Sequence, residues 1–142
     1  MSKKKIVIIS TIVLVIIIGI VLWLSTANIE ASGYSYSDEY ISLGYVPDGF
    51  ELVQNDSSDY SVTLVFSGNG YFMLSSDSVD AQYSFDTENC TFEYLLVNDY
   101  DAVYIENPRG NILFWNDSKR SYTMTSDLTK NIMLKIAENV NR

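Results

Sequence analysis

The sequence predicts an α+β fold, in which one C-terminal helix packs on a curved antiparallel sheet of about six strands, preceded by a single N-terminal transmembrane helix. Three observations lead to this prediction. An uncharged apolar run lies near the N-terminus, apolar and polar residues alternate repeatedly in the middle, and a stripe with helical spacing closes the chain. We therefore divide the chain into a basic cytoplasmic stub (1–5), a transmembrane helix (6–24), a linker (25–38) and an extracytoplasmic α+β domain (39–142).

The apolar run from Ile6 to Leu24 contains 19 residues without a charge. As a helix it would be about 28 Å long, close to the ~30 Å hydrocarbon core of a bilayer. Lysines 3 to 5 precede it, and lysine-rich flanks stay in the cytoplasm. We therefore expect a single-pass cell-membrane protein with a cytoplasmic N-terminus and an extracellular C-terminal domain. The alternative is a secreted protein cleaved near Ala27, although the apolar region of a signal peptide is usually about 7–15 residues.

The linker and the first strands follow this segment. Residues 25–38 are rich in Ser, small residues and Tyr and have no periodicity, which is typical of a linker. Residues 60–66 alternate as a strand does, and residues 71–74 return antiparallel to them across the turn Ser67–Gly70. The predicted apolar face of this first strand consists of Tyr60, Val62, Leu64 and Phe66.

Two further hairpins are predicted. Residues 91–97 and 102–105 pair across a turn at 98–101. Residues 112–115 and 122–124 pair across the polar loop that joins them. We expect Trp115, at the end of one of these strands, to lie in the core opposite the helix.

The stretch GYVPDGF, residues 44–50, combines a proline with turn residues. Pro47 fixes φ, and Asp48 with Gly49 supports a tight turn that leaves Tyr45 and Phe50 free to pack inward. We interpret it as the corner where the linker ends and the sheet begins, rather than as a docking loop.

The C-terminal segment has the pattern of an amphipathic helix. Ser126 is the expected N-cap, and Asp127 suits the positive end of the helix dipole. The apolar stripe comprises Leu128, Ile132, Met133, Ile136, Ala137 and Val140. A single stripe needs a surface to cover, and the sheet provides one.

The charges are distributed unevenly along the chain. Between Ile6 and Pro108 there are 15 acids and no Lys or Arg. From Ser25 onward, 18 acids face 6 bases, a net charge of −12. Such a surface repels phosphate backbones, so we expect no nucleic-acid partner. It either keeps the domain soluble or attracts cations or a basic partner.

The residue types restrict the available chemistry. The chain has no histidine, which removes Ser-His-Asp and Cys-His mechanisms and the usual zinc sites. Cys90 is the sole cysteine, so no intrachain disulfide forms, and we expect a half-buried strand residue rather than an intermolecular bridge or a reactive thiol. We predict no catalytic, cofactor-binding or metal-binding residues, no cofactor, and no enzyme activity; the binding residues are left open.

Two alternatives concern calcium and the tyrosines. Turn acids that could supply oxygen ligands for Ca²⁺ are Asp77, Asp80, Asp99 and Asp101, although none has EF-hand spacing. The eleven Tyr could form a sugar- or peptide-binding surface, or simply lie half-buried on strands that favour them.

Short motifs follow one another along the chain: YVPDGFEL at 45–52, DTEN at 86–89, LVNDYDAVYI at 96–105, LFW at 113–115 and KIAENV at 135–140. Their order resembles that of a family of uncharacterised extracytoplasmic domains from Gram-positive bacteria, often found on anti-sigma-factor-like membrane proteins. The resemblance covers about Tyr40 to Val140 and implies no catalytic residue. A stub of residues 1–5 is too short to hold a sigma factor, so signalling would require another membrane protein.

These features predict a membrane-anchored, non-enzymatic extracytoplasmic domain that binds or senses a cell-envelope ligand or a partner protein. Its partners would be the membrane, through residues 6–24, and an envelope protein, peptide or glycan. The alternative is a structural or assembly accessory of an envelope complex, in which residues 6–24 pack against other helices; an envelope hydrolase is a third possibility. Within that segment Gly19 stands alone, which favours a plain anchor.

Overall fold

The computed structural model describes residues 32–78, 84 and 88–141. The predicted stub, the transmembrane helix and most of the linker lie outside the described residues. Within the described ranges, no helix has both the length and the apolar character that a membrane crossing requires.

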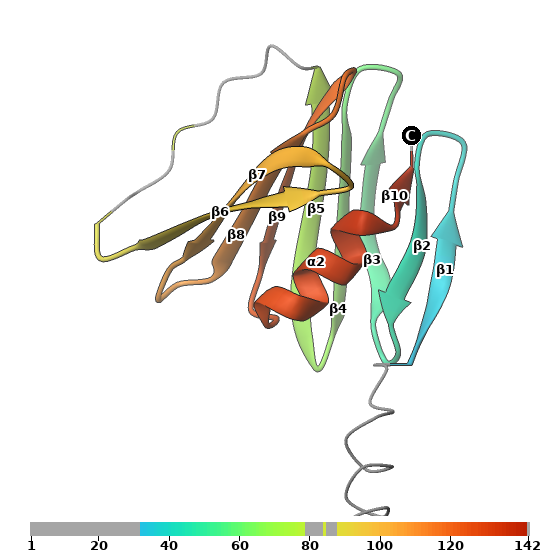
Figure 1. Ribbon diagram of the computed structural model, residues 1–142. Helices are drawn as coiled ribbons and strands as arrows, with labels where there is room; N and C mark the ends of the chain where they lie inside the picture. The colour runs from blue at the N-terminus through green and yellow to red at the C-terminus, as the bar shows by residue number, and fades with distance from the viewer. Residues whose placement is uncertain (1–31, 79–83, 85–87, 142) are drawn as a thin grey trace, which may run out of the picture. The chain divides into compact units, whose positions relative to one another are not determined.

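The described chain forms ten strands and one helix (Figure 1). In order these are β1 Gly33–Ser37, β2 Ser42–Pro47, β3 Glu51–Ser57, β4 Val62–Gly68, β5 Gly70–Ser78, β6 Thr91–Val97, β7 Tyr100–Glu106, β8 Asn111–Asn116, β9 Arg120–Ser126, α2 Lys130–Glu138 and β10 Val140–Asn141.

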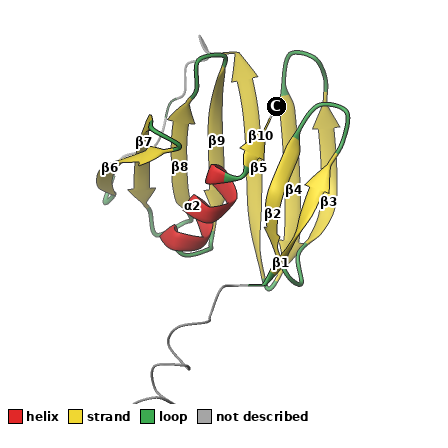
Figure 2. Cartoon of the chain, turned by 45° about the vertical axis from the view of Figure 1, so that its right-hand side comes forward, coloured by secondary structure: helices red, strands yellow, loops and turns green. Residues whose placement is uncertain are grey.

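The strands form two antiparallel sheets. The larger has seven strands in the order β3-β4-β5-β9-β8-β7-β6, and the smaller has the order β1-β2-β10. Helix α2 lies against one face of the larger sheet and also contacts β2 (Figures 1 and 2). The predicted α+β class is therefore confirmed, but the number of strands was underestimated, and the smaller sheet was not foreseen.

Sequence reasoning missed four strands: β1, β3 and β10 lie at sheet edges, and β2 is the middle strand of the smaller sheet. Residues 33–37, which we expected in the linker, form β1 and pair with β2. Residues 51–57, with the sequence ELVQNDS, form β3 and pair with β4. Edge strands need little burial, so their side chains do not show the alternation that reveals an inner strand.

The core lies between the larger sheet and the layer made by α2 and β2. The sheet contributes fully buried side chains such as those of Phe66 and Phe72, whose rings stack at 4.6 Å. Opposite them, Leu43, Met133 and Ile136 are likewise fully buried. Trp115 is also buried and stacks on Tyr122 with ring centroids 4.9 Å apart, so its predicted core position is confirmed.

The proline turn has the predicted form. Strand β2 ends at Pro47, the backbone N–H of Phe50 donates to the Pro47 carbonyl at 3.3 Å, and Gly49 has φ +82°. Tyr45 and Phe50 are both buried. The turn leads from the smaller sheet into the larger one, so it marks the start of the larger sheet rather than the end of the linker.

The predicted cap of the helix is wrong. Ser126 belongs to β9; its hydroxyl donates to the Tyr71 carbonyl at 2.7 Å and accepts from the Leu128 N–H at 2.9 Å. The Asp127 carboxylate accepts from the Tyr71 N–H at 2.8 Å. The bonds to Tyr71 tie the end of β9 to β5. The helix begins later, after Thr129, and the side chain of Thr129 makes no capping hydrogen bond.

The predicted apolar face of residues 60–66 is confirmed except at its first residue. Val62, Leu64 and Phe66 are fully buried, whereas Tyr60 is 84% exposed in the turn before β4. The Arg120 guanidinium donates to the carbonyl of Tyr60 at 3.0 Å and holds this turn against the start of β9.

Candidate functional site

Strand β6 ends the larger sheet and exposes apolar side chains. In the described part of the chain it pairs with β7 and with no other strand. Three alternate residues are exposed: Phe92 by 44%, Tyr94 by 82% and Leu96 by 57%. We call these three side chains, together with the outer backbone edge of β6, the β6 edge.

The three exposed side chains of the β6 edge lie on the face of the larger sheet that does not face α2. The neighbouring residues of β6 have the other orientation: Val97 is buried, and the Glu93 carboxylate accepts from Nζ of Lys130 on α2 at 2.7 Å. Tyr94 is opposite Val103 of β7, which in turn is opposite Phe114 of β8. The exposed side chains therefore continue an apolar patch that extends inward over two further strands.

The backbone of β6 is regular along its whole length. Its register with β7 runs from Thr91 opposite Glu106 to Val97 opposite Tyr100 without a bulge. A two-residue turn joins the strands, with positive φ at Asn98 (48°) and Asp99 (69°), as a type I′ hairpin requires.

This turn determines which backbone groups point outward. The pair next to a two-residue turn, Val97 and Tyr100, is hydrogen-bonded, and hydrogen-bonded and non-bonded pairs then alternate along the ladder. The residues of β6 in non-bonded pairs are Phe92, Tyr94 and Leu96. The same residues that expose apolar side chains thus direct their N–H and C=O groups away from β7.

The hairpin formed by β6 and β7 is acidic. Residues 91–106 contain the acids Glu93, Asp99, Asp101 and Glu106 and no Lys or Arg. Lys130 compensates Glu93, and this hydrogen bond is the main reason why the pKa of Lys130 is raised above its usual value. The surroundings of the β6 edge therefore favour a cationic ligand.

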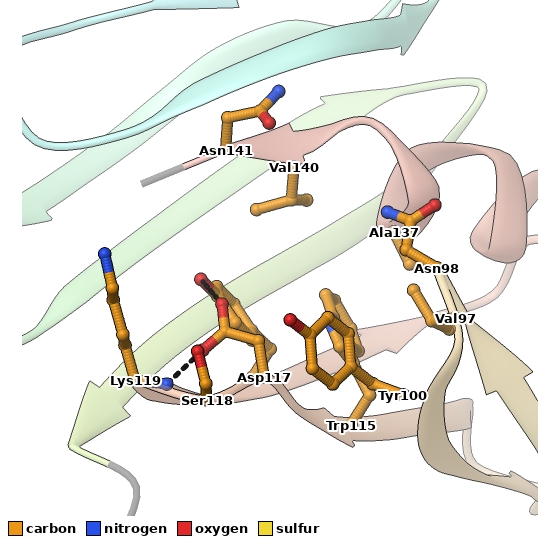
Figure 3. A pocket seen from close by; sticks show the side chains of 11 residues that line it. Val97, Asn98, Tyr100, Trp115, Asp117, Ser118, Lys119, Ala137, Val140 and Asn141 are labelled. Carbon is orange, nitrogen blue, oxygen red and sulfur yellow. Dashed lines mark hydrogen bonds between the residues drawn. The ribbon is translucent and has the colours of Figure 1, made fainter.

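A polar pocket of about 290 Å³ lies at the turn of the same hairpin (Figure 3). Asn98 and Tyr100 line it from the β6–β7 side, and Asp117 and Lys119 from the β8–β9 turn. Residues of β10 lie across the pocket from Tyr100, as Figure 3 shows.

Several polar groups of the pocket are already occupied by structural hydrogen bonds. The Asp117 carboxylate accepts from the N–H of Lys119 at 2.6 Å and from the hydroxyl of Tyr122 at 2.9 Å. The Asn98 side-chain amide donates to the Glu138 carbonyl at 2.8 Å, which joins the hairpin turn to the end of α2. The pocket can receive a small polar group, and the Asp117 carboxylate holds the β8–β9 turn through its hydrogen bonds.

The described acids among those considered for calcium belong to separate parts of the larger sheet. Asp77 lies on β5, whereas Asp99 and Asp101 lie in the β6–β7 hairpin, and Asp80 is outside the described residues. No group of three or more His, Cys, Asp or Glu side chains in the described part of the chain could hold a metal ion.

Cys90 lies immediately before β6 rather than within a strand. It is half-buried, as expected, and is not disulfide-bonded. The side-chain amide of Asn107 donates to its sulfur at 3.4 Å.

The ten tyrosines that the structure describes fall into three groups. Tyr45, Tyr104 and Tyr122 are buried, and Tyr36, Tyr40 and Tyr71 are half-buried, as the structural interpretation expects for most of the rings. Four are exposed: Tyr34, Tyr60, Tyr94 and Tyr100. They do not form one surface, because Tyr34 and Tyr60 lie by the β3 end of the larger sheet and the other two belong to the β6–β7 hairpin.

The β6 edge was not identified from the sequence, although its strand was. The segment TFEYLLV has apolar residues in both alternating positions, since Leu95 and Val97 lie between and after the exposed residues. Such a segment is typical of a strand with two covered faces. The apolar residues of this segment indicate a binding surface only once the strand order places β6 at the edge of the sheet.

Comparison with known proteins gives one result. Residues 40–140 match the family described as Domain of unknown function (DUF4367). The range agrees with the resemblance found from the motifs. No curated protein matches the chain.

Proposed function

Since the chain belongs to this family of domains of unknown function, we propose from its surface that it is a non-enzymatic binding domain for a partner protein at the cell envelope. The apolar segment of residues 6–24 anchors it in the membrane, and the acidic domain lies on the extracytoplasmic side. The resemblance to domains of Gram-positive anti-sigma-factor-like proteins supports this setting.

The observation that carries the proposal is the β6 edge. Exposed aromatic and aliphatic side chains gather there, with Tyr94 82% exposed, beside backbone groups that pair with no other strand among the described residues. Contiguous apolar surface is costly to keep in water and marks interaction sites. Tyrosine is also enriched in protein interfaces, because its ring supplies contact area and its hydroxyl remains solvated.

A second candidate function is the binding of a small polar envelope ligand in the pocket at the hairpin turn. The proximity of Tyr100, Asn98 and Lys119 favours it, since an aromatic ring, an amide and a cation can together bind a sugar or a peptide terminus. We rank this function second because the Asp117 carboxylate of the pocket already accepts hydrogen bonds from Lys119 and Tyr122.

Site-specific photocrosslinking tests the two candidates. A photoreactive phenylalanine analogue replaces Tyr94, Tyr100 or Tyr60, one at a time, in the full chain within its native host. Tyr60 is the matched control, because it is the same residue type with 84% exposure near the opposite edge of the sheet.

We expect one crosslinked protein from position 94, identified by mass spectrometry, and none from position 60. A crosslinked product from position 100 alone would indicate that the ligand binds in the pocket at the hairpin turn and not at the β6 edge. Equal products from positions 94 and 60, or none from either, would overturn the proposal.

A further inference from the structure

We infer that the β6 edge binds an extended basic segment of another polypeptide, which adds to the larger sheet as an eighth strand with alternating apolar and Lys or Arg residues. The inference rests on the proposed function and specifies the chemistry of its partner.

The backbone provides the first part of the argument. The N–H and C=O groups of Phe92, Tyr94 and Leu96 point outward along a strand without a bulge or a proline. Natural proteins protect such edges with bulges, prolines, lysines or covering elements. Residues 91–97 contain no bulge, no proline and no lysine, so an extended segment can pair along the whole strand.

The side chains determine the pattern of that segment. Residues of an added strand alternate between the two faces of the sheet. Those on the face of Phe92, Tyr94 and Leu96 would contact apolar side chains. Those on the opposite face would lie next to Glu93, which pairs with Lys130 of α2, and Glu106 lies on the same face of the strand beyond. The pattern that fits is apolar on one face and basic on the other.

Charge selects this occupant over a second copy of the chain. The β6–β7 hairpin carries four acids and no base, within a region of net charge −12 from Ser25 onward. Pairing two β6 edges would bring these acids together in one interface. A basic segment would instead reduce the repulsion, and electrostatic attraction would speed its association.

Peptide binding to the full chain in detergent micelles tests the inference. The probe is the acetylated, amidated heptapeptide Lys-Val-Lys-Val-Lys-Val-Lys. One control has the same composition with its four lysines and three valines in separate blocks, and another has Glu in place of Lys. Amide hydrogen exchange by NMR reports where the peptide binds.

We expect the alternating basic peptide to slow exchange of the N–H groups of Phe92, Tyr94 and Leu96 at least tenfold. The N–H groups of Thr91, Glu93 and Leu95 already pair with β7 and should change little. Tyr94→Lys should weaken binding at least tenfold. Tyr60→Lys makes the same change in charge at an equally exposed tyrosine and should change the affinity less than twofold.

Several outcomes would overturn the inference. These are equal binding of the block peptide, equal weakening by Tyr60→Lys, or binding without protection of the outward amides. Protection that rises with protein concentration in the absence of peptide would assign the edge to a second copy. If photocrosslinking at position 94 captures a partner but the peptide does not bind, the proposed function stands and the strand-addition mode fails. If the crosslink is also absent, both fail.

Discussion

The two edges of the seven-stranded sheet differ in how they face water. Strand β3 at one edge is interrupted by a register shift between Leu52 and Gln54, whereas β6 at the other edge is regular from end to end. The exposed residues of β3 are mostly polar, and those of β6 include Phe92, Tyr94 and Leu96. Of the two edges, only β3 contains a bulge, one of the features that discourage strand pairing.

Neighbouring residues also fix the β3 edge in place. The side-chain amide of Asn55 donates to the Tyr36 hydroxyl at 3.0 Å and to the Asp38 carboxylate at 2.9 Å. The ring of Tyr36 packs edge-on against Phe66 in the core. Thus β1 supports β3, while β6 is supported from α2 by the ion pair between Glu93 and Lys130. Strand β3 exposes one large apolar side chain, that of Val53, whereas β6 exposes three, so the clustering of such side chains is a property of β6 and not of sheet edges in this fold.

The largest effect is expected from removing the support of the β3 edge. Tyr36→Ala would delete the contact with Phe66 and two side-chain hydrogen bonds. Because Tyr36 is half-buried, we expect the free energy of unfolding to fall by about 2 kcal/mol, below the 3–5 kcal/mol typical of fully buried aromatic rings. Urea denaturation of the full chain in detergent measures this change.

Tyr60→Ala is the control for this substitution. Tyr60 is 84% exposed, so its removal should change stability by less than about 0.5 kcal/mol. Equal losses from the two variants would mean that Tyr36 does not support the β3 edge.

A smaller effect with a defined pH dependence is expected at Asp38. Burial alone would raise the pKa of this carboxyl, but hydrogen bonds hold the pKa below its usual value. The donors are the N–H groups of Ile41 and Tyr40 and the side chains of Tyr36 and Asn55. Asp38→Ala should destabilise the domain by about 1 kcal/mol at neutral pH.

The sign of the pH dependence follows from the lowered pKa of Asp38. The stabilisation by the carboxylate is complete above the ordinary value of 3.8 and is lost as pH falls through the lower pKa of the folded state. The difference in stability between the native chain and Asp38→Ala should therefore shrink below about pH 3.8. A difference that stays constant from pH 7 to pH 2.5 would show that the charge of Asp38 contributes nothing.

The same contrast explains what could be predicted from the sequence. Inner strands bury one side completely, so the alternation of Val62, Leu64 and Phe66 revealed β4. Strand β1 escaped detection because its side chains are mostly exposed and Tyr36 alone reaches the core. Edge positions impose few requirements on a sequence, and local pattern therefore says little about them.

The candidate site depends on information that no local pattern contains. Strand β6 was predicted, but its place at the edge follows from the pairing of β5 with β9, which lie far apart in the sequence. Exposure of Tyr94 results from that non-local topology. The acidic character of the domain, by contrast, was readable directly, and attraction of cations or a basic partner was one of its two interpretations, beside solubility.

The smallest effect is expected from the ion pair that supports β6. Lys130→Gln would remove the cation that contacts Glu93 at 2.7 Å. Pairs between exposed side chains contribute little to stability, so the unfolding midpoint in urea should be nearly unchanged. The variant would, however, leave Glu93 uncompensated beside the β6 edge, which increases the attraction for a basic segment.

Binding of the alternating Lys-Val peptide to Lys130→Gln measures this attraction. We expect affinity to rise about twofold to threefold at low salt, and the gain to disappear at high salt, where exposed charges are screened. Lys119→Gln is the control, because it makes the same charge change at the β8–β9 turn, on a different hairpin. An equal rise in affinity for both variants would mean that the net charge of the domain, rather than Glu93, attracts the peptide. The β3 and β6 edges would then differ in their apolar side chains but not in their attraction for a basic segment.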